Sequence, residues 1–259
     1  MTYEEILKKL VEEDERFIVM TAENRAAIRN LPNQIGDRFI DTGITEQTLV
    51  GSAAGLALRG RIPVIHALAT FLTMRAFEFI RTDVGIGNLN VKIVGGFPGF
   101  LSDGNGATHQ SIEDVSLMRG IPNINVWCPA DEEDMLLGLE TVLKDDRAFY
   151  IRYNNSKPAI SHNKNFEIGK AEVISEGTDV AILVYGVLLA QAVEAKRILE
   201  EQGKSVRLIN VRTPKPIDEE QILNAARECK IIATVEDHFL SGGLYSIIAE
   251  IFLRNQITA

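Results

Sequence analysis

The chain has 259 residues, of which 46% are hydrophobic, and a formal net charge of −9. This composition supports one large domain or two ordinary ones with a buried core, and it excludes global disorder. Nucleic acid is excluded as a partner, because the dispersed acidic surface offers no basic stripe to neutralise phosphates.

The compartment is indicated by the cysteines and the N-terminus. Cys128 and Cys229 are the only cysteines, and they lie far apart without a cluster of metal ligands. They predict reduced, buried thiols. The N-terminus is charged from its first residues, unlike a signal peptide, and no apolar run approaches the ~20 residues that span a bilayer. We therefore expect a cytoplasmic protein without a membrane partner.

Apolar runs alternate with helical patterns in the first half of the chain. An amphipathic helix begins after Thr2, which forms a capping pattern with Glu5. The strands predicted after it are 17–20, 63–67, 91–94, 124–127 and 148–152, and the helices are 46–59, 72–84, 111–119 and 131–144, the last capped by Asp131. Strands that alternate with helices are typical of a parallel sheet covered on both faces.

The second half repeats this alternation after a polar stretch at 153–164. Its predicted strands are 179–185, 205–211 and 230–235, and its helices are 187–202, 218–228 and 243–254. The sequence thus predicts an α/β protein of two domains, each a mostly parallel sheet with helices on both faces. We place the domains at 1–155 and 179–259, with a linking strap at 156–178.

The first segment of chemical interest is Arg-Phe-Ile-Asp-Thr-Gly-Ile-Thr-Glu-Gln at 38–47, which opens a helix rich in glycine and alanine. Small residues allow the backbone to lie close to a neighbour or a ligand. Glu46 stands at the start of this helix, where the helix dipole favours a carboxylate. Taken alone, Glu46 also fits an ordinary acid in the first turn of a helix.

A glycine-rich loop at 95–110 follows a predicted strand and precedes a helix. In a parallel sheet this is the carboxyl edge, where ligands bind. His109 stands near its end and has a side chain suited to proton transfer near neutrality. A capping or core histidine is the alternative. Neither a P-loop nor the dinucleotide-binding glycine pattern fits this loop.

A third segment, 69–78, also follows a strand. Phe71, Met74 and Phe77 are spaced three apart and share one helical face. Such a face most simply packs in the core. The alternative is that a flat heteroaromatic ring stacks on Phe71 at the border of a cleft.

These segments occur in the order and spacing of the transketolase family. The matching stretches are 38–47, 70–77, 104–119 and 123–131, followed by Val-Glu-Asp-His at 235–238 and Gly-Gly-Leu at 242–244. The chain resembles the pyrimidine-binding and C-terminal domains of a transketolase, as found in split two-subunit forms. The resemblance covers essentially the whole chain. It implies a thiamin diphosphate enzyme that transfers a two-carbon ketol unit between sugars.

The resemblance implies a role for individual residues. Glu46 matches the catalytic glutamate that hydrogen-bonds the aminopyrimidine ring of the cofactor, and His109 matches the catalytic histidine that faces the sugar. The other implied cofactor-binding residues are Phe71, which matches the aromatic that stacks on the pyrimidine, Leu68 and Phe77 as supporting walls, Arg75 as a neighbour, and Glu23 as an acid near the cofactor across the subunit interface.

The family's diphosphate-binding pattern, Gly-Asp-Gly followed by paired asparagines, does not occur in this sequence. Asp103-Gly104 lacks the preceding glycine, and Asn154-Asn155 lies too far along the chain. The resemblance therefore implies an N-terminal partner subunit that holds Mg²⁺ and the diphosphate. A heterotetramer is the expected assembly, because relatives dimerise around two active sites.

Three positions depart from the family pattern at the substrate. Asn105 stands where relatives usually have an aspartate that contacts a sugar hydroxyl, and Phe97 stands where many have a histidine. After the strand that ends at Arg152, asparagines replace a phosphate-binding arginine of many relatives. Loss of a bidentate phosphate partner predicts an atypical sugar, unphosphorylated or modified, that contacts His109, Asn105 and Phe97.

Two other interpretations remain open. A β subunit of a decarboxylating 2-oxo acid dehydrogenase shares the Gly-Ile-x-Glu-Gln element, although Gly-Ala-Thr-His-Gln at 106–110 favours transketolase. The other is a non-catalytic interaction subunit, against which intact Glu46, Phe71 and His109 argue. Of the remaining histidines, we expect a solvated His162 and an interface or core position for His238.

Overall fold

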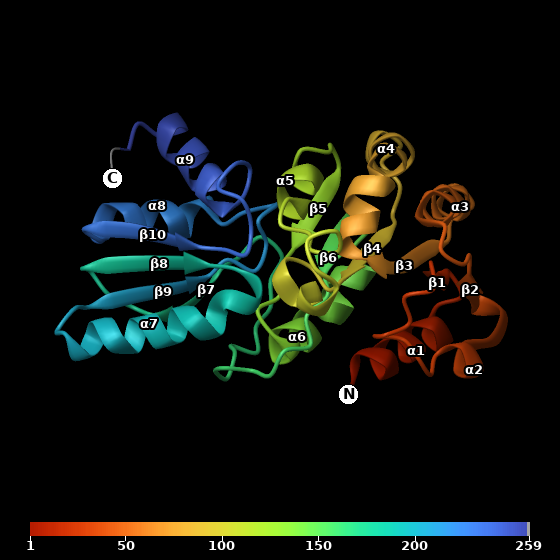
Figure 1. Cartoon of the computed structure of the whole chain (residues 1–259), viewed down its shortest axis with the longest axis horizontal. Helices are drawn as coiled ribbons and strands as arrows, with labels where there is room; N and C mark the ends of the chain where they lie inside the picture. The colour runs from red at the N-terminus through yellow and green to blue at the C-terminus, as the bar shows by residue number, and fades with distance from the viewer. Residues whose placement is uncertain (258–259) are drawn as a thin grey trace.

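The computed structural model describes residues 1–257, and two sheets with helices on both faces make up its architecture (Figure 1). The first sheet has six strands in the order β2-β1-β3-β4-β6-β5, and every pair is parallel. Its strands are β1 (Phe17–Thr21), β2 (Phe39–Asp41), β3 (Ile62–Leu68), β4 (Lys92–Gly96), β5 (Ile124–Trp127) and β6 (Ala148–Arg152). Its helices are α1 (Tyr3–Glu13), α2 (Pro32–Ile35), α3 (Glu46–Leu58), α4 (Phe77–Phe79), α5 (Asp114–Arg119) and α6 (Glu132–Lys144).

The second sheet has four strands in the order β10-β8-β9-β7. β7 is antiparallel to β9, and the other pairs are parallel. The strands are β7 (Glu172–Ser175), β8 (Val180–Val184), β9 (Val206–Asn210) and β10 (Ile231–Val235), and the helices are α7 (Leu189–Glu201), α8 (Glu219–Glu228) and α9 (Leu244–Arg254). The predicted α/β class with two mostly parallel sheets is confirmed.

Alternation within β1 explains how helices cover both faces of the first sheet. Phe17 and Val19 pack with α1 and α6, whereas Ile18 and Met20 pack with α3 and α5. Successive side chains of a strand point to opposite faces, and both faces of β1 are buried. The strand therefore reads as a continuous apolar run, which is typical of parallel sheets.

The apolar core continues from one sheet to the other. Val126 and Tyr150 of the first sheet belong to the same buried cluster as Tyr185 and Ile209 of the second. The two sheets are thus joined by packed side chains as well as by the connecting chain.

Local capping follows the sequence. The Thr2 hydroxyl accepts from the Glu5 backbone and the Glu5 carboxylate accepts from the Thr2 backbone, which completes the predicted capping box of α1. Asp131 caps α6 by accepting from the Asp134 backbone. Both helices begin where these caps predict.

The helix predicted at 72–84 is interrupted in the structure. Two π-helical turns, Phe71–Arg75 and Ile80–Ile86, flank the short α4. The Ala76 N–H donates to the Phe71 carbonyl at 3.1 Å, a bond five residues back. Apolar spacing of three does not distinguish such turns from an α-helix, and π turns occur often at functional sites.

Two short strands were not predicted, and the helix predicted at 111–119 begins only at Asp114. β2 is a half-buried edge strand of three residues, too short for a pattern. β7 lies inside the segment predicted as a linking strap, and only its first residue, Glu172, is buried. Both owe their conformation to the neighbouring strand. No helix within residues 1–257 has the length and apolar character to cross a membrane.

Candidate active site

A cleft of about 390 Å³ opens at the carboxyl edge of the first sheet. It lies beyond the ends of β1 and β3, the position at which parallel α/β sheets bind ligands. Its lining residues are Ala22, Glu23 and Asn24 after β1, Ile44 and Glu46 at the start of α3, Leu68 at the end of β3, Phe71 in the first π turn, and His109. The structure thus brings together five of the residues that the sequence singled out for cofactor or sugar: Glu23, Glu46, Leu68, Phe71 and His109.

Glu46 is the first residue of α3 and is 2% exposed. Its carboxylate is partnered by Arg75, whose Nη1 donates to Oε2 at 2.9 Å. The guanidinium of Arg75 also lies 4.0 Å from the centroid of the Phe71 ring. Arg75 is not among the residues that line the cleft. It braces Glu46 and Phe71 through an ion pair and a cation–π contact.

His109 meets Phe71 across the cleft. Their ring centroids are 5.1 Å apart in an edge-to-face arrangement. The His109 backbone donates to the Gly106 carbonyl at 3.0 Å, and its Nδ1 lies 2.9 Å from the Thr108 hydroxyl. The glycine-rich loop therefore folds back on itself and presents the imidazole beside the aromatic wall.

Comparison with known proteins identifies the family. Residues 1–159 match the transketolase pyrimidine-binding domain, and residues 169–259 match the transketolase C-terminal domain. The chain belongs to the transketolase family.

The relatives of this transketolase-family chain include subunits of split transketolases. It is 37% identical to the 6-deoxy-6-sulfo-D-fructose transketolase subunit SqwH of Clostridium sp. strain MSTE9, with 98% of this chain and 80% of the relative covered. It is 34% identical to one subunit of the apulose-4-phosphate transketolase of Actinobacillus succinogenes, with 92% and 77% covered. A solved split gene transketolase, described as an inactive β4 tetramer, superposes with a TM-score of 0.88 at 35% identity, with 97% of this chain and 83% of that chain covered.

These relatives confirm the predicted resemblance and the predicted kind of enzyme, a transketolase-type transferase subunit. They do not favour the alternative of a 2-oxo acid dehydrogenase β subunit. Membership of the transketolase family implies dependence on thiamin diphosphate.

The cleft of this transketolase subunit fits the ring end of that cofactor. Phe71, Leu68 and Ile44 supply flat and apolar surface, and Glu46 supplies one buried carboxylate. The charged lining consists of Glu23 and Glu46, and no lysine or arginine lines this cleft in the described part of the chain. A diphosphate does not fit this acidic lining, whereas the apolar wall and the single buried carboxylate fit the ring.

Besides Arg75, three predicted site residues lie outside the cleft. Phe77 is half-buried and packs against the core. This agrees with the simpler of the two interpretations of the face that Phe71, Met74 and Phe77 share, namely core packing. Asn105 donates to the Ser102 hydroxyl at 3.1 Å. Phe97 is 42% exposed and lines an adjacent cavity of about 230 Å³ with Ala26, Leu101, Tyr153 and Asn155.

Residues 22–24 were only partly anticipated. Glu23 was predicted from the resemblance, whereas Ala22 and Asn24 were not. The Glu23 backbone has φ 65°, an uncommon value for a residue other than glycine, and its N–H donates to the Asp41 carboxylate at 3.3 Å. The position after a buried parallel strand was the signal that could have found all three.

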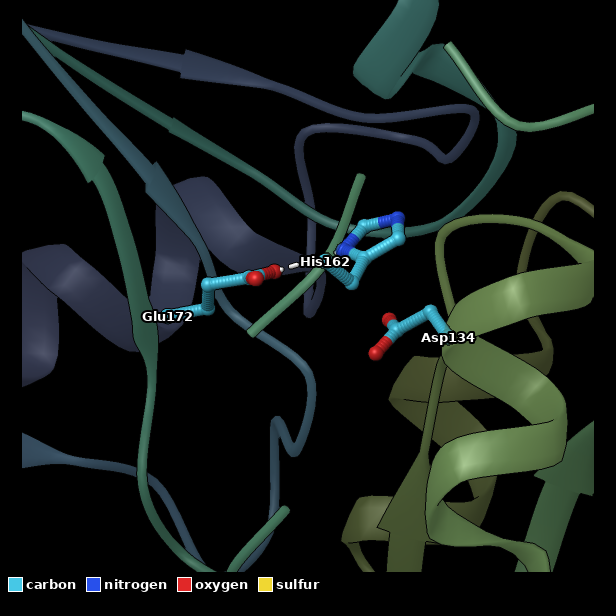
Figure 2. A group of neighbouring side chains, drawn as sticks. All are labelled: Asp134, His162 and Glu172. Atoms are coloured by element: carbon cyan, nitrogen blue, oxygen red, sulfur yellow. Dashed lines mark hydrogen bonds and ion pairs between the residues drawn. The ribbon is translucent and has the colours of Figure 1, made fainter. Parts of the chain in front are cut away.

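His162, predicted to be solvated, is buried between the two domains, which corrects that prediction. Its Nε2 lies 2.9 Å from the Asp131 carboxylate and its Nδ1 lies 2.7 Å from that of Glu172. Burial alone would lower the pKa of His162, but these hydrogen bonds raise it to about 10. Figure 2 shows the ring lying between Glu172 of β7 and Asp134 of α6.

Asp134, His162 and Glu172 have the geometry of a potential metal site, but an arginine already enters this cluster. Arg212 Nε lies 2.7 Å from Asp134, and its Nη2 lies 3.1 Å from Glu172. Asp131 completes the group. Two cationic side chains thus face three carboxylates, and the cluster acts as a buried ion-pair network that joins the domains.

His66 is a packed histidine. Its Nε2 lies 2.9 Å from the Tyr3 hydroxyl, and burial lowers its pKa to about 4. It is therefore neutral near pH 7. His238 contacts the first domain, as predicted, through a bond of 3.2 Å from the Ser116 N–H to Nε2.

Proposed function

We propose that this chain is the pyrimidine-binding subunit of a split transketolase that transfers a two-carbon ketol unit between sugars. The observation that carries this proposal is the meeting of Glu46, Phe71 and His109 in one cleft. These residues come from three separate segments of the chain, and each has a distinct use toward cofactor or sugar.

Glu46 acts on the cofactor ring. Because Arg75 occupies Oε2, we assign Oε1 to the hydrogen bond with the aminopyrimidine nitrogen. Phe71 stacks on the ring, and Leu68 excludes water from it. When bound, thiamin diphosphate supplies the carbanion chemistry, and the protein supplies orientation and proton management. Glu23 lies near the subunit interface in this proposal.

His109 acts on the sugar. With Nδ1 beside the Thr108 hydroxyl, we assign Nε2 to a sugar hydroxyl, where an imidazole can hold or move a proton near neutral pH. The edge-to-face contact with Phe71 holds the imidazole next to the cofactor-binding surface.

The partner subunit completes the site. The acidic lining of the cleft supports the proposal that Mg²⁺ and the diphosphate are held by an N-terminal partner subunit with the family's diphosphate-binding domain. A heterotetramer with two active sites is the assembly we propose. The free cysteines Cys128 and Cys229 support a reducing, cytoplasmic location.

The substrate is proposed to be an atypical sugar. Phe97, Leu101 and Tyr153 make the cavity beside the cleft largely apolar. Arg152 is the arginine nearest in sequence to the position at which many relatives have a phosphate-binding arginine. It is buried and forms ion pairs with Asp114 and Asp237. The two split relatives act, by their names, on 6-deoxy-6-sulfofructose and apulose 4-phosphate. An unphosphorylated or modified sugar fits this lining better than an ordinary sugar phosphate.

The test is reconstitution with the subunit that carries the diphosphate-binding domain. We expect thiamin diphosphate and Mg²⁺ to bind the complex in calorimetry and each isolated chain far more weakly. We expect unphosphorylated ketoses or 6-deoxy-6-sulfofructose to be used at about tenfold or higher kcat/KM than xylulose 5-phosphate, about 1.4 kcal/mol in the barrier. Turnover of xylulose 5-phosphate with ribose 5-phosphate at ordinary transketolase efficiency would contradict the substrate proposal.

A further inference from the structure

The second domain holds both ends of the loop that carries His109. We propose that Asp237, with its neighbours His238 and Phe239, is a positioning element for this loop in the sugar-handling step. We call residues 97–112 the His109 loop and residues 236–242, which follow β10, the clamp segment. The inference rests on the proposed role of His109, and it assigns a function to the second domain.

The His109 loop is closed at its base. Gly99 N–H donates to the Ser111 carbonyl at 3.0 Å, and Ser111 N–H donates to the Gly99 carbonyl at 3.2 Å. The Ser111 hydroxyl also lies 3.2 Å from the Gly99 nitrogen. Because His109 is only two residues from Ser111, any shift of this base moves the imidazole.

Asp237 lies against Gly99, at the closed base of the His109 loop. It is 1% exposed, and Arg152 Nη1 donates to its Oδ1 at 2.6 Å. Gly99 has φ +58°, and a Cβ added there would overlap the Asp237 carboxylate. The backbone of Gly99 therefore rests against the Asp237 side chain, and only glycine permits this approach.

Arg152 connects the base to the helix that follows the loop. Its Nε donates to Asp114 Oδ2 at 2.9 Å, and the Tyr150 hydroxyl donates to the same oxygen at 2.7 Å. Asp114 is buried and stands in the first turn of α5. Arg152 thus joins the second domain, through Asp237, to the exit of the His109 loop. Paired and desolvated on both sides, this arginine has few alternative positions.

The clamp segment also holds the exit of the loop by its backbone and by His238. Phe239 N–H donates to the Ile112 carbonyl at 2.9 Å, and Ser116 N–H donates to His238 Nε2 at 3.2 Å. The His238 Nδ1 lies 2.7 Å from the Phe239 carbonyl, so the tautomer with its proton on Nδ1 satisfies both contacts. Gly242 lies against Ser116, where a Cβ would overlap the serine.

The cofactor-facing residues have an anchor of their own in addition to the clamp segment. Glu46 and Phe71 belong to α3 and the first π turn, and Arg75 links them within the first domain. We therefore expect a loosened clamp segment to displace His109 from its contact with Phe71, while Arg75 keeps Glu46 and Phe71 in place. Misplacement of a reacting group by about 1 Å can reduce a rate about a hundredfold.

A pair of variants tests this inference in the complex reconstituted with the partner subunit. Asp237→Asn keeps the shape of the side chain but removes its charge, and Gly99→Ala keeps every charge but pushes the loop off Asp237. We expect either to lower kcat for two-carbon transfer, with 3-hydroxypyruvate as donor, about tenfold to a hundredfold. The Kd of thiamin diphosphate, measured by calorimetry, should change less than twofold. Hydrogen exchange at residues 100–110 of the full chain should accelerate at least about tenfold.

The matched control is His162→Gln, which weakens the other buried contact between the domains. Its partners are Asp131 and Glu172, outside the His109 loop. We expect it to lower the melting temperature while loop exchange and kcat stay at wild-type values. The inference is overturned if His162→Gln changes kcat and loop exchange as much as Asp237→Asn does, or if Gly99→Ala and a folded Asp237→Asn leave both at wild-type values.

The double variant adds a second criterion. If both substitutions act through one contact, the loss in the double variant should equal the larger single loss and not their product. If the loss of kcat in the double variant equalled the product of the two single losses, the substitutions would act independently. The inference of a shared contact would then be wrong. If the reconstituted complex did not bind thiamin diphosphate, the proposed function would be wrong. Hydrogen exchange of the loop needs neither cofactor nor sugar, so it would still test the clamp segment.

Discussion

The cleft at the edge of the first sheet and the network between the domains both use a histidine and carboxylates, and in both an arginine pairs with a carboxylate. The polar atoms of the network are satisfied by one another, whereas those of the cleft are not. In the network, His162 has a carboxylate on each ring nitrogen, and Arg212 fills the remaining space. In the cleft, Glu46 is bound on one oxygen only, and His109 and Phe71 line open volume. Residue type therefore does not distinguish a reactive site from a structural one. The distinction lies in which polar atoms remain available in a cavity.

This comparison predicts opposite consequences for substitutions in the two regions. A change in the cleft should cost activity and little stability, because its groups are held ready for a ligand. A change in the network should cost stability and no activity, because its groups satisfy one another. The predictions below run from the largest expected loss of activity to the smallest.

Glu46→Ala should produce the largest loss. Without the carboxylate, proton sharing with the cofactor ring is lost, and we expect kcat to fall about a thousandfold in the reconstituted complex, within the usual range for an acid–base group. The matched control is Glu78→Ala, an exposed acid (73%) paired with Arg81 at 3.7 Å. Steady-state kinetics with 3-hydroxypyruvate measure both. Unchanged turnover in Glu46→Ala would remove the enzymatic claim for this chain.

His109→Asn should lower kcat for two-carbon transfer about a hundredfold, because the side chain loses its ability to move a proton. The cofactor ring does not need this residue, so the Kd of thiamin diphosphate should remain within about twofold. Calorimetry and kinetics on the same preparation separate the two effects. An equal weakening of cofactor binding would place His109 on the cofactor instead of the sugar.

The sequence led to these two residues by different routes. His109 lies in the loop after the buried strand β4, whereas Glu46 follows β2, a half-buried edge strand that was not predicted. The carboxyl ends of parallel strands meet at one edge. That rule places His109 at the ligand-binding edge, whereas the place of Glu46 and the chemical roles of both residues came from the family resemblance. The family and the kind of enzyme are confirmed, whereas the role of each residue stays a prediction.

Features that depend on contacts distant in sequence were missed. His162 lies in a polar stretch whose composition indicates solvent, yet two domains close over it and provide acids on both sides. β7 gains its conformation from β9. Composition and periodicity describe a residue's own neighbourhood and therefore cannot reveal these partners.

Arg75 was predicted only as a neighbour of the cofactor, and the structure suggests a sharper experiment. Arg75→Gln removes the ion pair with Glu46 and the cation–π contact with Phe71. The two contacts are together worth about 1–2 kcal/mol at a half-exposed site, so the Kd of thiamin diphosphate should rise about tenfold. Arg81→Gln, which removes an exposed arginine (49%) near the same helix, is the control. Tighter cofactor binding in Arg75→Gln would mean that Arg75 competes with the ring and does not brace the site.

His162→Gln should have no effect on cofactor binding and a clear, pH-dependent effect on stability. The pKa of His162 is raised from 6.5 to about 10 in the folded chain. A raised pKa means that the folded state holds the proton more tightly than the unfolded state. The stabilisation is therefore fully present below about pH 6.5 and is lost as the pH rises through 10. The free energy of unfolding in urea should fall more steeply between pH 7 and pH 10 for the wild type than for His162→Gln. Plotted against pH, the free energies of the two proteins should converge at high pH. Because the other titrating groups are the same in both proteins, the difference isolates this histidine. If the free energies of the two proteins changed in parallel with pH, His162 would not be charged in the folded chain. The network between the domains would then contain one cationic side chain, Arg212.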